Sequence, residues 1–312
     1  MATRKIVLVT GANQGIGYEI VKKILKQGSH FVVMACRSAE RAAAAVNQLK
    51  AELQLGAEQV PGMISLDLSN IGTIETAVEE FTKKYGEQGQ LTTLVNNAGV
   101  LYSAESKESE FEKAVATLAV NFTNTVAFTE KMLPLMTKGG SIVMVSSRLG
   151  ALTELPGVEL RKKLASEDLT LEALHAMAGQ YQQLVSQGIQ SEAGWPLADG
   201  YVPAYCVSKA LLNAYVRITA PEMLSERSIF LNTTCPGWTQ TRMTGGQGHN
   251  TPEQGAETPT WVAVDPSFGS GQHHGLFFGG MRRVRYYDGE TVTEETIKKD
   301  SLVISDTKGP II

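Results

Sequence analysis

Thr10-Gly11-Ala12-Asn13-Gln14-Gly15-Ile16-Gly17 is the stretch of this sequence that decides the fold. It follows a short apolar run, Ile6–Val9, and opens a segment with apolar residues at helical spacing. Gly11 permits a tight turn, Gly15 a close approach of the backbone to a pyrophosphate, and Gly17 close contact between helix and strand. A glycine-containing turn without a ligand is the alternative, which the flanking pattern disfavours. The stretch therefore predicts a dinucleotide-binding loop.

Short apolar runs alternate with longer amphipathic stretches over most of the chain, which indicates parallel strands joined by helical crossovers. We therefore expect an α/β fold, a doubly wound parallel sheet of the Rossmann type. A single domain is expected over residues 1–280, and residues 281–312 form a C-terminal extension. The expected strands are Ile6–Val9, Phe31–Met34, Gln59–Leu66, Leu91–Val95, Ser141–Val145 and Ile229–Thr233. The expected helices are one that ends at Gly28, then Ala39–Leu55, Ile71–Tyr85, a long one over Glu108–Met136 that ends near Leu133-Pro134, and Pro203–Ser225.

Two segments do not fit this alternation. The first, about residues 151–200, is a helical insertion with its own amphipathic helix, which Thr170 can cap and Gly188 can end. Its apolar face consists of Leu171, Leu174, Met177, Tyr181, Leu184 and Val185. The second follows Gly280, where Arg282–Tyr287 has strand character and Asp288-Gly289 is typical of a hairpin turn. The sequence assigns this tail no role.

Residues at the ends of the second and third expected strands bear on which dinucleotide binds. Arg37 stands where a carboxylate would be expected to hold the ribose hydroxyls of NAD(H), and its guanidinium suits a 2′-phosphate. The pattern favours NADP(H), and a solvated arginine at a helix start is the alternative. Asp67, followed by Leu68, can accept a hydrogen bond from the adenine amino group or cap the next helix.

Four polar residues form the candidate catalytic set: Asn121, Ser147, Tyr205 and Lys209. A free tyrosine has a pKa of about 10. A lysine four residues further along a helix places an ammonium beside the phenol and favours the phenolate. Tyr205 can then exchange a proton with a substrate oxygen that Ser147 holds, while Asn121 can hold a water that passes protons to Lys209. The alternative for the Tyr205 and Lys209 pair is an exposed pair on an amphipathic helix.

Composition sets the remaining bounds. The chain has 312 residues, a net charge of −4 and three cysteines, so we expect no binding to nucleic acid or membrane and a reducing, cytoplasmic setting. The N-terminus runs directly into a strand, so no signal peptide is expected. His273-His274 has no accompanying cluster of ligands, so no metal is expected. Cys235 is either a small core residue or a reactive thiol, and Trp238 either forms a substrate wall or belongs to the core.

Several motifs support a resemblance to a known family: Asn96-Asn97-Ala98-Gly99, Val145-Ser146-Ser147, Tyr205-x-Val207-Ser208-Lys209, Cys235-Pro236-Gly237-Trp238 and Pro252-Glu253-x-Gly255. With the glycine stretch, they make the chain resemble the short-chain dehydrogenases/reductases. It is most similar to the branch of monomeric carbonyl reductases and their plant relatives. The resemblance covers roughly residues 4 to 280.

The resemblance implies a function and site roles. It implies reduction of aldehyde, ketone or quinone carbonyls with NADPH, Tyr205 donating the proton. It places Pro236 and Gly237 against the nicotinamide. The full set of expected cofactor contacts is Gly11, Asn13, Gln14, Gly15, Ile16, Gly17, Arg37, Asp67, Leu68, Asn97, Ala98, Gly99, Pro236, Gly237, Thr239 and Thr241, and Trp238 is expected to contact substrate. A reductase dedicated to one ketone and a non-catalytic NADP(H)-binding sensor are the alternatives.

Three features depart from the typical pattern of the family or of this branch. Ser147 and Tyr205 are 58 residues apart, whereas most of the family separates them by about a dozen. In the branch, the extra segment covers the two long helices that otherwise form an oligomer interface, so the resemblance implies a monomer. Gln14 stands where the branch usually has lysine, which removes one contact to the 2′-phosphate. The tail after Gly280 is also longer than in close relatives.

Overall fold

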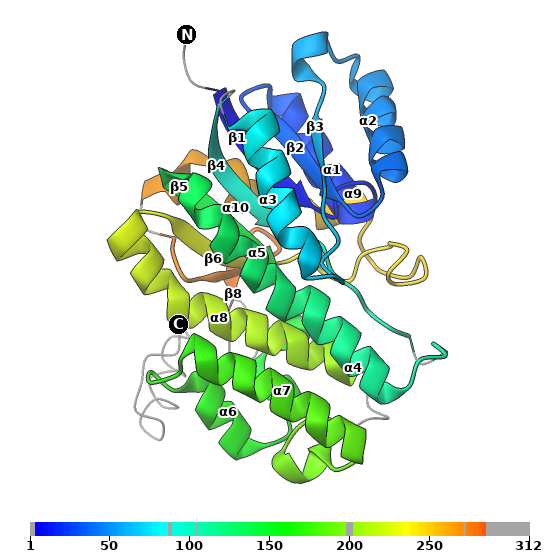
Figure 1. Ribbon diagram of the computed structural model, residues 1–312, viewed down its shortest axis with the longest axis vertical. Coiled ribbons are helices and arrows are strands. Elements are labelled where there is room, and N and C mark those ends of the chain that lie inside the picture. The colour runs from blue at the N-terminus through cyan, green and yellow to red at the C-terminus, as the bar shows by residue number, and fades with distance from the viewer. Residues whose placement is uncertain (1–3, 87–88, 104, 198–201, 271–272, 285–312) are drawn as a thin grey trace.

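The computed structural model describes residues 4–86, 89–103, 105–197, 202–270 and 273–284 (Figure 1). Within these ranges, eight strands form one sheet in the order β3-β2-β1-β4-β5-β6-β7-β8. The first seven strands are parallel, and β8 pairs antiparallel with β7 at the edge. The strands are β1 (Arg4–Thr10), β2 (Phe31–Cys36), β3 (Gly62–Ser65), β4 (Gly89–Asn96), β5 (Met136–Val145), β6 (Phe230–Cys235), β7 (Phe277–Gly279) and β8 (Arg282–Val284). The predicted doubly wound fold is confirmed.

Helices cover both faces of this sheet because successive side chains of a strand point to opposite faces. In β1, Ile6 and Leu8 pack with one set of helices, and Val7 and Val9 pack with the other. The first set is α3 (Gly72–Tyr85), α4 (Glu110–Leu118), α5 (Asn124–Met132) and α8 (Pro203–Arg227). The second set is α1 (Gly15–Gln27), α2 (Ala39–Leu53) and α10 (Glu257–Val264), which follows the short α9 (Pro252–Gly255).

The long helix predicted over Glu108–Met136 is wrong in one respect, because it is not continuous. A π-helical turn over Ala119–Thr123 separates α4 from α5. Such turns insert an extra residue into a helix and are frequent at functional sites. Asn121 lies inside this turn, and the hydroxyl of Thr125 donates to the carbonyl of Val120 at 2.7 Å. Sequence periodicity alone does not reveal the interruption.

The insertion contains two helices, α6 (Val158–Ala165) and α7 (Leu171–Gln187), of which only α7 was predicted. As expected, the Thr170 hydroxyl accepts from the Ala173 N–H at 3.1 Å, and Gly188 ends α7 in the left-handed conformation. Helix α7 packs against α4 and α8, and α6 packs against α8 (Figure 1). Beyond α7, the Trp195 ring lies 5.3 Å from that of Tyr181, and both rings are fully buried.

The carboxy-terminal part of the described chain completes the sheet edge. Strand β7 was not predicted, and β8 continues the sheet past residue 280, where the sequence placed the domain boundary. The rest of the predicted strand character, the Asp288-Gly289 turn and the remainder of the extension lie outside the described residues. In the portion of the chain that the structure describes, no helix is long and apolar enough to cross a membrane.

Candidate active site

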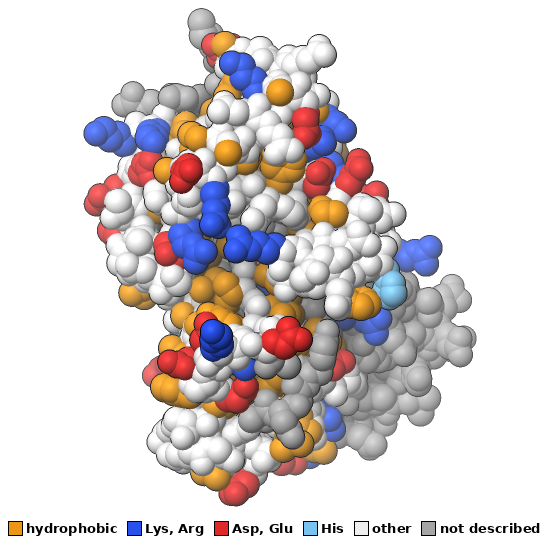
Figure 2. All heavy atoms as spheres, turned by 90° about the vertical axis from the view of Figure 1, so that its right-hand side faces the viewer, with side chains coloured by type: hydrophobic (Ala, Val, Ile, Leu, Met, Phe, Trp, Pro, Cys, Tyr) orange, Lys and Arg blue, Asp and Glu red, His pale blue; other side chains and the backbone are white. Residues whose placement is uncertain are grey.

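The candidate residues gather at the carboxyl edge of the sheet, which is where open α/β sheets bind ligands. The loops that follow β4 and β6 lie on the right-hand side of Figure 1, and Figure 2 looks directly onto that side. Figure 2 shows Lys and Arg side chains gathered beside a recess in which hydrophobic side chains are visible. This face of the molecule therefore combines positively charged and exposed apolar side chains.

The glycine loop joins β1 to α1 and requires glycine for two different reasons. Gly11 and Gly15 have φ angles of 63° and 56°, in the left-handed region. A Cβ on Gly17 would lie 2.5 Å from the Asn97 amide nitrogen, so the close contact predicted for Gly17 is present. At the α1 N-terminus, Gln14 makes no side-chain cap, and the first turn carries no acidic residue. Backbone N–H groups there are suited to receive an anion.

The ends of β2 and β3 hold the residues expected near the adenosine half of a dinucleotide. Arg37 is exposed at the end of β2, directly before Ser38, whose hydroxyl caps α2. One carboxylate oxygen of Asp67 accepts from the N–H and the hydroxyl of Ser69, at 3.0 and 2.7 Å. Asp67 thus orders the loop before α3 and does not cap the helix itself. The Leu68 side chain is buried in the core, so only its backbone can contact a ligand.

The segment Asn97–Gly99 fastens β4 to β1 at this edge. The Thr10 hydroxyl accepts from the N–H groups of Asn97 and Ala98, both at 3.0 Å, and the Asn97 amide donates to the Thr10 carbonyl at 3.0 Å. A Cβ on Gly99 would lie 3.2 Å from the Asn121 amide oxygen and 3.8 Å from the Lys209 amine. The bare backbone of Gly99 therefore lies beside both candidate catalytic residues.

Asn121 has a fully engaged side chain. Its amide oxygen accepts from the Val100 N–H at 2.8 Å, and its nitrogen donates to the Val100 carbonyl at 2.9 Å and the Ser208 hydroxyl at 3.1 Å. Both amide N–H groups are therefore used within the protein. The side chain links the loop after β4 to helix α8, and this link fixes the loop above Lys209.

Ser147 is the second residue after β5 and is half-buried. Its hydroxyl accepts from the Leu149 N–H at 3.1 Å and caps the short 3-10 helix Arg148–Gly150. That helix lies against α8, since a Cβ on Gly150 would come within 2.7 Å of the Lys209 carbonyl oxygen. The hydroxyl oxygen of Ser147 is thus held by the 3-10 helix, which itself packs against the helix of Tyr205.

Tyr205 and Lys209 lie in the first turns of α8, with Tyr205 half-exposed and Lys209 buried. The Lys209 amine lies 5.5 Å from the centre of the Tyr205 ring and donates to the Val145 carbonyl at 2.9 Å. Burial lowers the pKa of Lys209 from its ordinary value to about 8. The pair therefore joins helix α8 to the end of β5, and it is not the exposed pair of the alternative interpretation.

The loop after β6 lies across the opposite side of the site. Gly237 has a φ angle of 75°, and the Pro236 carbonyl accepts from the Thr239 hydroxyl and the Asn250 amide at 3.2 and 3.1 Å. Thr241 lies next to the glycine loop, because a Cβ on Gly15 would be 3.4 Å from its methyl group. The loop is therefore in place to contact a ligand held on the glycine stretch.

Cys235 and Trp238 were each predicted as either a core residue or a residue of the site, and the structure buries the first and exposes the second. Cys235 is buried, and burial raises the pKa of its thiol, which fits the small core residue and not the reactive thiol. The Trp238 side chain is 48% exposed and packs edge-on against His249 at 4.9 Å. Trp238 is therefore not a core residue. His274, in contrast, accepts from the Leu231 N–H at 3.2 Å within the sheet edge.

Sequence reasoning missed several residues that support the site. The Thr10 hydroxyl and the Asn250 amide each hold a backbone segment that a ligand would touch, and Ser208 holds Asn121. Met243 was also missed, and its methyl group is 3.8 Å from the position of a Cβ on Gly99. Thr10 could have been found as the residue that ends β1 before the glycine loop. The others depend on long-range contacts and leave no local signal.

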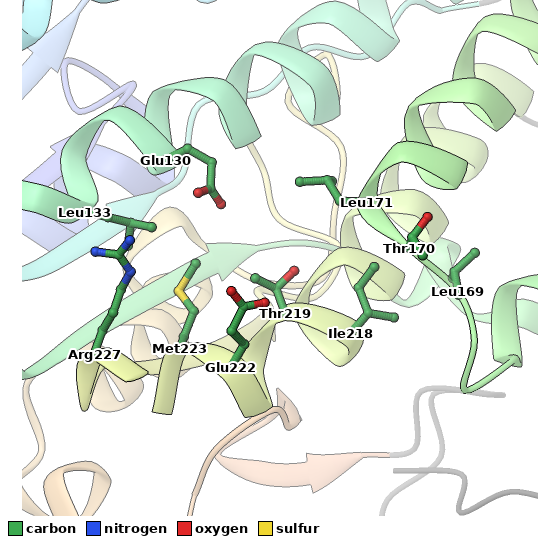
Figure 3. Close-up of a pocket in the computed structure, with 10 residues that line it drawn as sticks. All are labelled: Glu130, Leu133, Leu169, Thr170, Leu171, Ile218, Thr219, Glu222, Met223 and Arg227. Carbon is green, nitrogen blue, oxygen red and sulfur yellow. The ribbon is translucent and has the colours of Figure 1, made fainter. Parts of the chain in front are cut away.

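A separate cavity of about 380 Å³ lies away from this site, between α5, the start of α7 and the C-terminal half of α8. In Figure 3, Glu130 from α5 and Glu222 and Met223 from α8 point into the same space. Glu130 also accepts a hydrogen bond from the Tyr215 hydroxyl at 2.8 Å. The candidate catalytic residues do not line this cavity, so we place the active site at the sheet edge.

The residues at the sheet edge fit a dinucleotide. The uncapped N-terminus of α1 offers N–H groups to phosphates, and the exposed Arg37 guanidinium can form paired hydrogen bonds with a further phosphate. Gly99 leaves space above the Lys209 amine, which suits the hydroxyls of a ribose. Among the described residues, no group of three or more His, Cys, Asp and Glu side chains could hold a metal ion.

Comparisons with known proteins agree with this geometry. A family model described as short chain dehydrogenase matches residues 5–158. The chain is 35% identical over 277 residues to carbonyl reductase (NADPH) 1 of Mus musculus, covering 87% of this chain and 95% of the relative. The solved structure of salutaridine reductase from Papaver somniferum has a TM-score of 0.76 at 28% identity and covers 88% of this chain and 99% of its own. That of menthone neomenthol reductase from Mentha piperita has a TM-score of 0.73 at 28% identity, with coverages of 89% and 99%.

Proposed function

The chain belongs to the short-chain dehydrogenase family, and from this premise we propose that it uses NADPH to reduce the carbonyl group of aldehydes, ketones or quinones to the alcohol. It is an NAD(P)-dependent reductase related to carbonyl reductase. The observation that carries the finer proposal is the Lys209 amine, buried at the end of β5 and 5.5 Å from the Tyr205 ring. A protein that only bound the dinucleotide would not need a buried ammonium beside a half-exposed phenol.

The proposed roles follow from where each group lies. When bound, the dinucleotide supplies the hydride. Ser147 donates a hydrogen bond to the substrate oxygen, because its hydroxyl accepts from Leu149 and keeps its own hydrogen free to donate. Tyr205 gives its proton to that oxygen as negative charge develops on it. Lys209 stabilises the phenolate that remains, through the Coulomb attraction of its ammonium in a site that burial makes poorly screened.

We assign Asn121 a positioning role before a proton-relay role. Its two amide N–H groups are occupied by Val100 and Ser208, so its side chain has no N–H left to hold a water. A relay water of the kind expected from the sequence would have to donate to a carbonyl oxygen of Asn121, either the second lone pair of the amide oxygen or the backbone carbonyl. Asn121 lies in the π-helical turn. The residue inserted there changes which backbone N–H group donates to each helix carbonyl around Asn121.

The preference for NADPH rests on Arg37. Its guanidinium is exposed at the end of β2, and the neighbouring strand residues Ala35 and Cys36 offer no carboxylate to hold ribose hydroxyls. Gln14 is also exposed at the start of α1 but carries no charge. We therefore expect NADPH to be preferred over NADH, less strongly than in relatives with a lysine at this place.

We further propose that the protein is a monomer. Residues 206–216 of α8 are buried all round the helix, which means that the sheet covers one side and the insertion the other. The surface that could pair two subunits along α4 and α8 is thus already occupied by α7. Light scattering at micromolar concentration should give a mass near 33.6 kDa. A stable dimer or tetramer would contradict this proposal.

The test of function is NADPH consumption with a panel that contains a reactive quinone, an aromatic aldehyde and a cyclic ketone. We expect turnover with at least one class and formation of the alcohol or hydroquinone. Binding of NADPH without turnover of any class would favour the sensor alternative, because it would show an occupied cofactor site without chemistry. Turnover of a single ketone in a broad panel would favour the dedicated reductase.

A further inference from the structure

Arg148 stands beside the reacting groups, and the proposed mechanism gives it no role. It directly follows Ser147 and opens the short 3-10 helix that the Ser147 hydroxyl caps. The side chain is exposed, and two residues earlier the Ser146 N–H donates to the Thr234 carbonyl of the neighbouring strand β6 at 2.7 Å. Arg148 therefore follows a segment that is held against the end of β6, and it lies one residue from the proposed substrate contact.

The segment of Arg148 lies beside the end of β6, because Val145 at the end of β5 pairs with Thr234 of β6. The positive charges of Arg148 and Lys209 both act to lower the pKa of the Cys235 thiol, although burial has the larger, opposite effect. Cys235 leads directly into Pro236, Gly237 and the half-exposed Trp238. Arg148 is thus close along the sheet edge to the loop that carries the nicotinamide contacts proposed above, and the exposed ring of Trp238 belongs to the same loop.

No carboxylate of the protein neutralises this charge in the described part of the chain. The ion pairs there involve lysines with Glu52, Glu253, Glu80, Glu110, Glu75 and Glu159. The nearest acid along the chain, Glu154, is exposed and forms no ion pair with Arg148 among the described residues. Arg148 and Lys209 therefore leave the substrate side of the site with an excess of positive charge.

We propose that Arg148 determines substrate specificity by binding a carboxylate carried by the carbonyl substrate. This inference rests on the proposed function and names its substrate class: aldehydes or ketones that bear a carboxylate a few bonds from the carbonyl. Arginine presents a planar fork of N–H donors that matches a carboxylate in a bidentate manner. With the substrate oxygen on Ser147, the next residue is in place to hold an acidic group of the same small molecule.

The rest of the site is consistent with a substrate of mixed character. Trp238 and Met243 are 48% and 38% exposed, so each offers apolar surface to the body of a substrate. A site lined with apolar surface and a few polar groups orients its ligand through those polar groups. Arg148 would then fix the position of the substrate carboxylate and, with it, the face of the carbonyl group that receives the hydride.

The experiment compares matched acid and ester substrates. The rate constant kcat/KM is measured with NADPH for 3- and 4-carboxybenzaldehyde and for the methyl ester of each acid. We expect the wild-type protein to prefer at least one acid over its ester by about tenfold to a hundredfold, the range of a hydrogen bond to a charged group. In Arg148→Gln the acid-to-ester ratio should fall to near one, mainly through KM for the acid. Arg148→Lys should retain an intermediate ratio because it keeps the charge without the fork.

A matched control and the possible outcomes keep this inference separate from the proposed function. Arg227→Gln replaces an exposed arginine at the distant end of α8 and should leave the ratio as in the wild type. An acid preference that Arg148→Gln does not change would overturn the inference, as would wild-type turnover without any acid preference. If the wild-type protein reduces neither acids nor esters nor any compound of the panel, the proposed function fails instead. Added salt should reduce the wild-type ratio, because the attraction is between charges near the surface.

Discussion

The two sides of helix α8 are both buried, but they are buried by different kinds of contact. On the active-site side, Lys209 donates to the Val145 carbonyl, and Ser208 accepts from the Asn121 amide. On the outer side, α6 and α7 of the insertion pack against the helix, with Leu174 and Tyr181 buried in the shared core. Specific hydrogen bonds position the side chains on the active-site side, whereas apolar side chains pack on the outer side.

This difference predicts how each side responds to change. A directional polar contact performs chemistry only with one atom in one place, so removing that atom should reduce the rate and leave the fold intact. An apolar contact contributes free energy of unfolding in proportion to the area and volume it fills, so its removal should act on stability. Towards its C-terminus α8 has more exposed residues, and there it borders the cavity of Figure 3. The insertion therefore covers α8 less completely near its C-terminus.

The largest expected effect is that of Tyr205→Phe, which removes the proton donor and keeps the ring. Turnover of the best carbonyl substrate should fall by ~10²–10⁴-fold, while the melting temperature stays close to that of the wild type. The matched control is Tyr215→Phe on the same helix, which removes a hydrogen bond to Glu130 and should reduce stability slightly without reducing turnover. A Tyr205→Phe protein with more than about a tenth of the wild-type rate would show that another group supplies the proton.

On the other side of α8, Leu174→Ala should act on stability alone. Leu174 is fully buried between the insertion and the main core, and truncation of such a leucine costs ~2–5 kcal/mol of unfolding free energy. Chemical denaturation measures this loss, and kcat per folded molecule should change by less than about twofold. Gln180→Ala, at an exposed position of α7, is the control and should change stability by less than about 0.5 kcal/mol. A large fall in kcat would mean that the insertion and the catalytic side are coupled.

The pH dependence of the reaction tests whether the charge of Lys209 is needed for catalysis. Its pKa is lowered to about 8, so the amine is charged below this pH and loses its charge above it. The value of kcat/KM for NADPH should therefore fall as the pH rises above about 8, by up to about tenfold per pH unit. Lys209→Met should be slow throughout and should lack this descending limb.

Destabilisation by the titration of Lys209 cannot account for such a loss, because the lowered pKa of this lysine affects stability in the opposite direction. Between about 8 and the ordinary 10.5, the unfolded chain binds more protons at this lysine than the folded protein does. The contribution of Lys209 to the unfolding free energy therefore rises with pH in this window. An activity profile that stays flat up to about pH 10 would contradict a charged Lys209 as the partner of Tyr205.

The smallest expected effect is on cofactor choice. Arg37→Ala removes an exposed guanidinium and should raise KM for NADPH by about tenfold, the value of one charge-assisted contact to phosphate. KM for NADH should stay nearly unchanged, and this is the internal control. Equal losses with both dinucleotides would show that Arg37 does not touch the 2′-phosphate. Gln14→Lys should shift the preference in the other direction by adding a positive charge at the start of α1.

Much of the candidate site could be predicted from the sequence because its geometry depends on residues that are close together in the chain. Gly11 and Gly15 need positive φ angles that their own turn imposes, and Tyr205 and Lys209 share a helix face because they are four residues apart. The insertion helix was predicted together with its cap Thr170 and its end Gly188, since these signals lie within a few residues of the helix. The alternation of apolar runs and helices was sufficient for strands β1 to β6 and for their parallel pairing, but not for α6, α9, α10 and β7.

What the tertiary structure decided depends on contacts between distant segments. The sequence showed that Ser147 and Tyr205 are far apart, but only packing shows the 3-10 helix after Ser147 lying against α8. The burial of Lys209, which lowers its pKa, comes from β5 and β6 and not from its own helix. The π-helical turn at Asn121 and the position of Arg148 beside Cys235 likewise leave no periodic signal. Local geometry sets dihedral angles and helix faces, whereas burial and the environment of a charge are set by whatever the rest of the chain places around them.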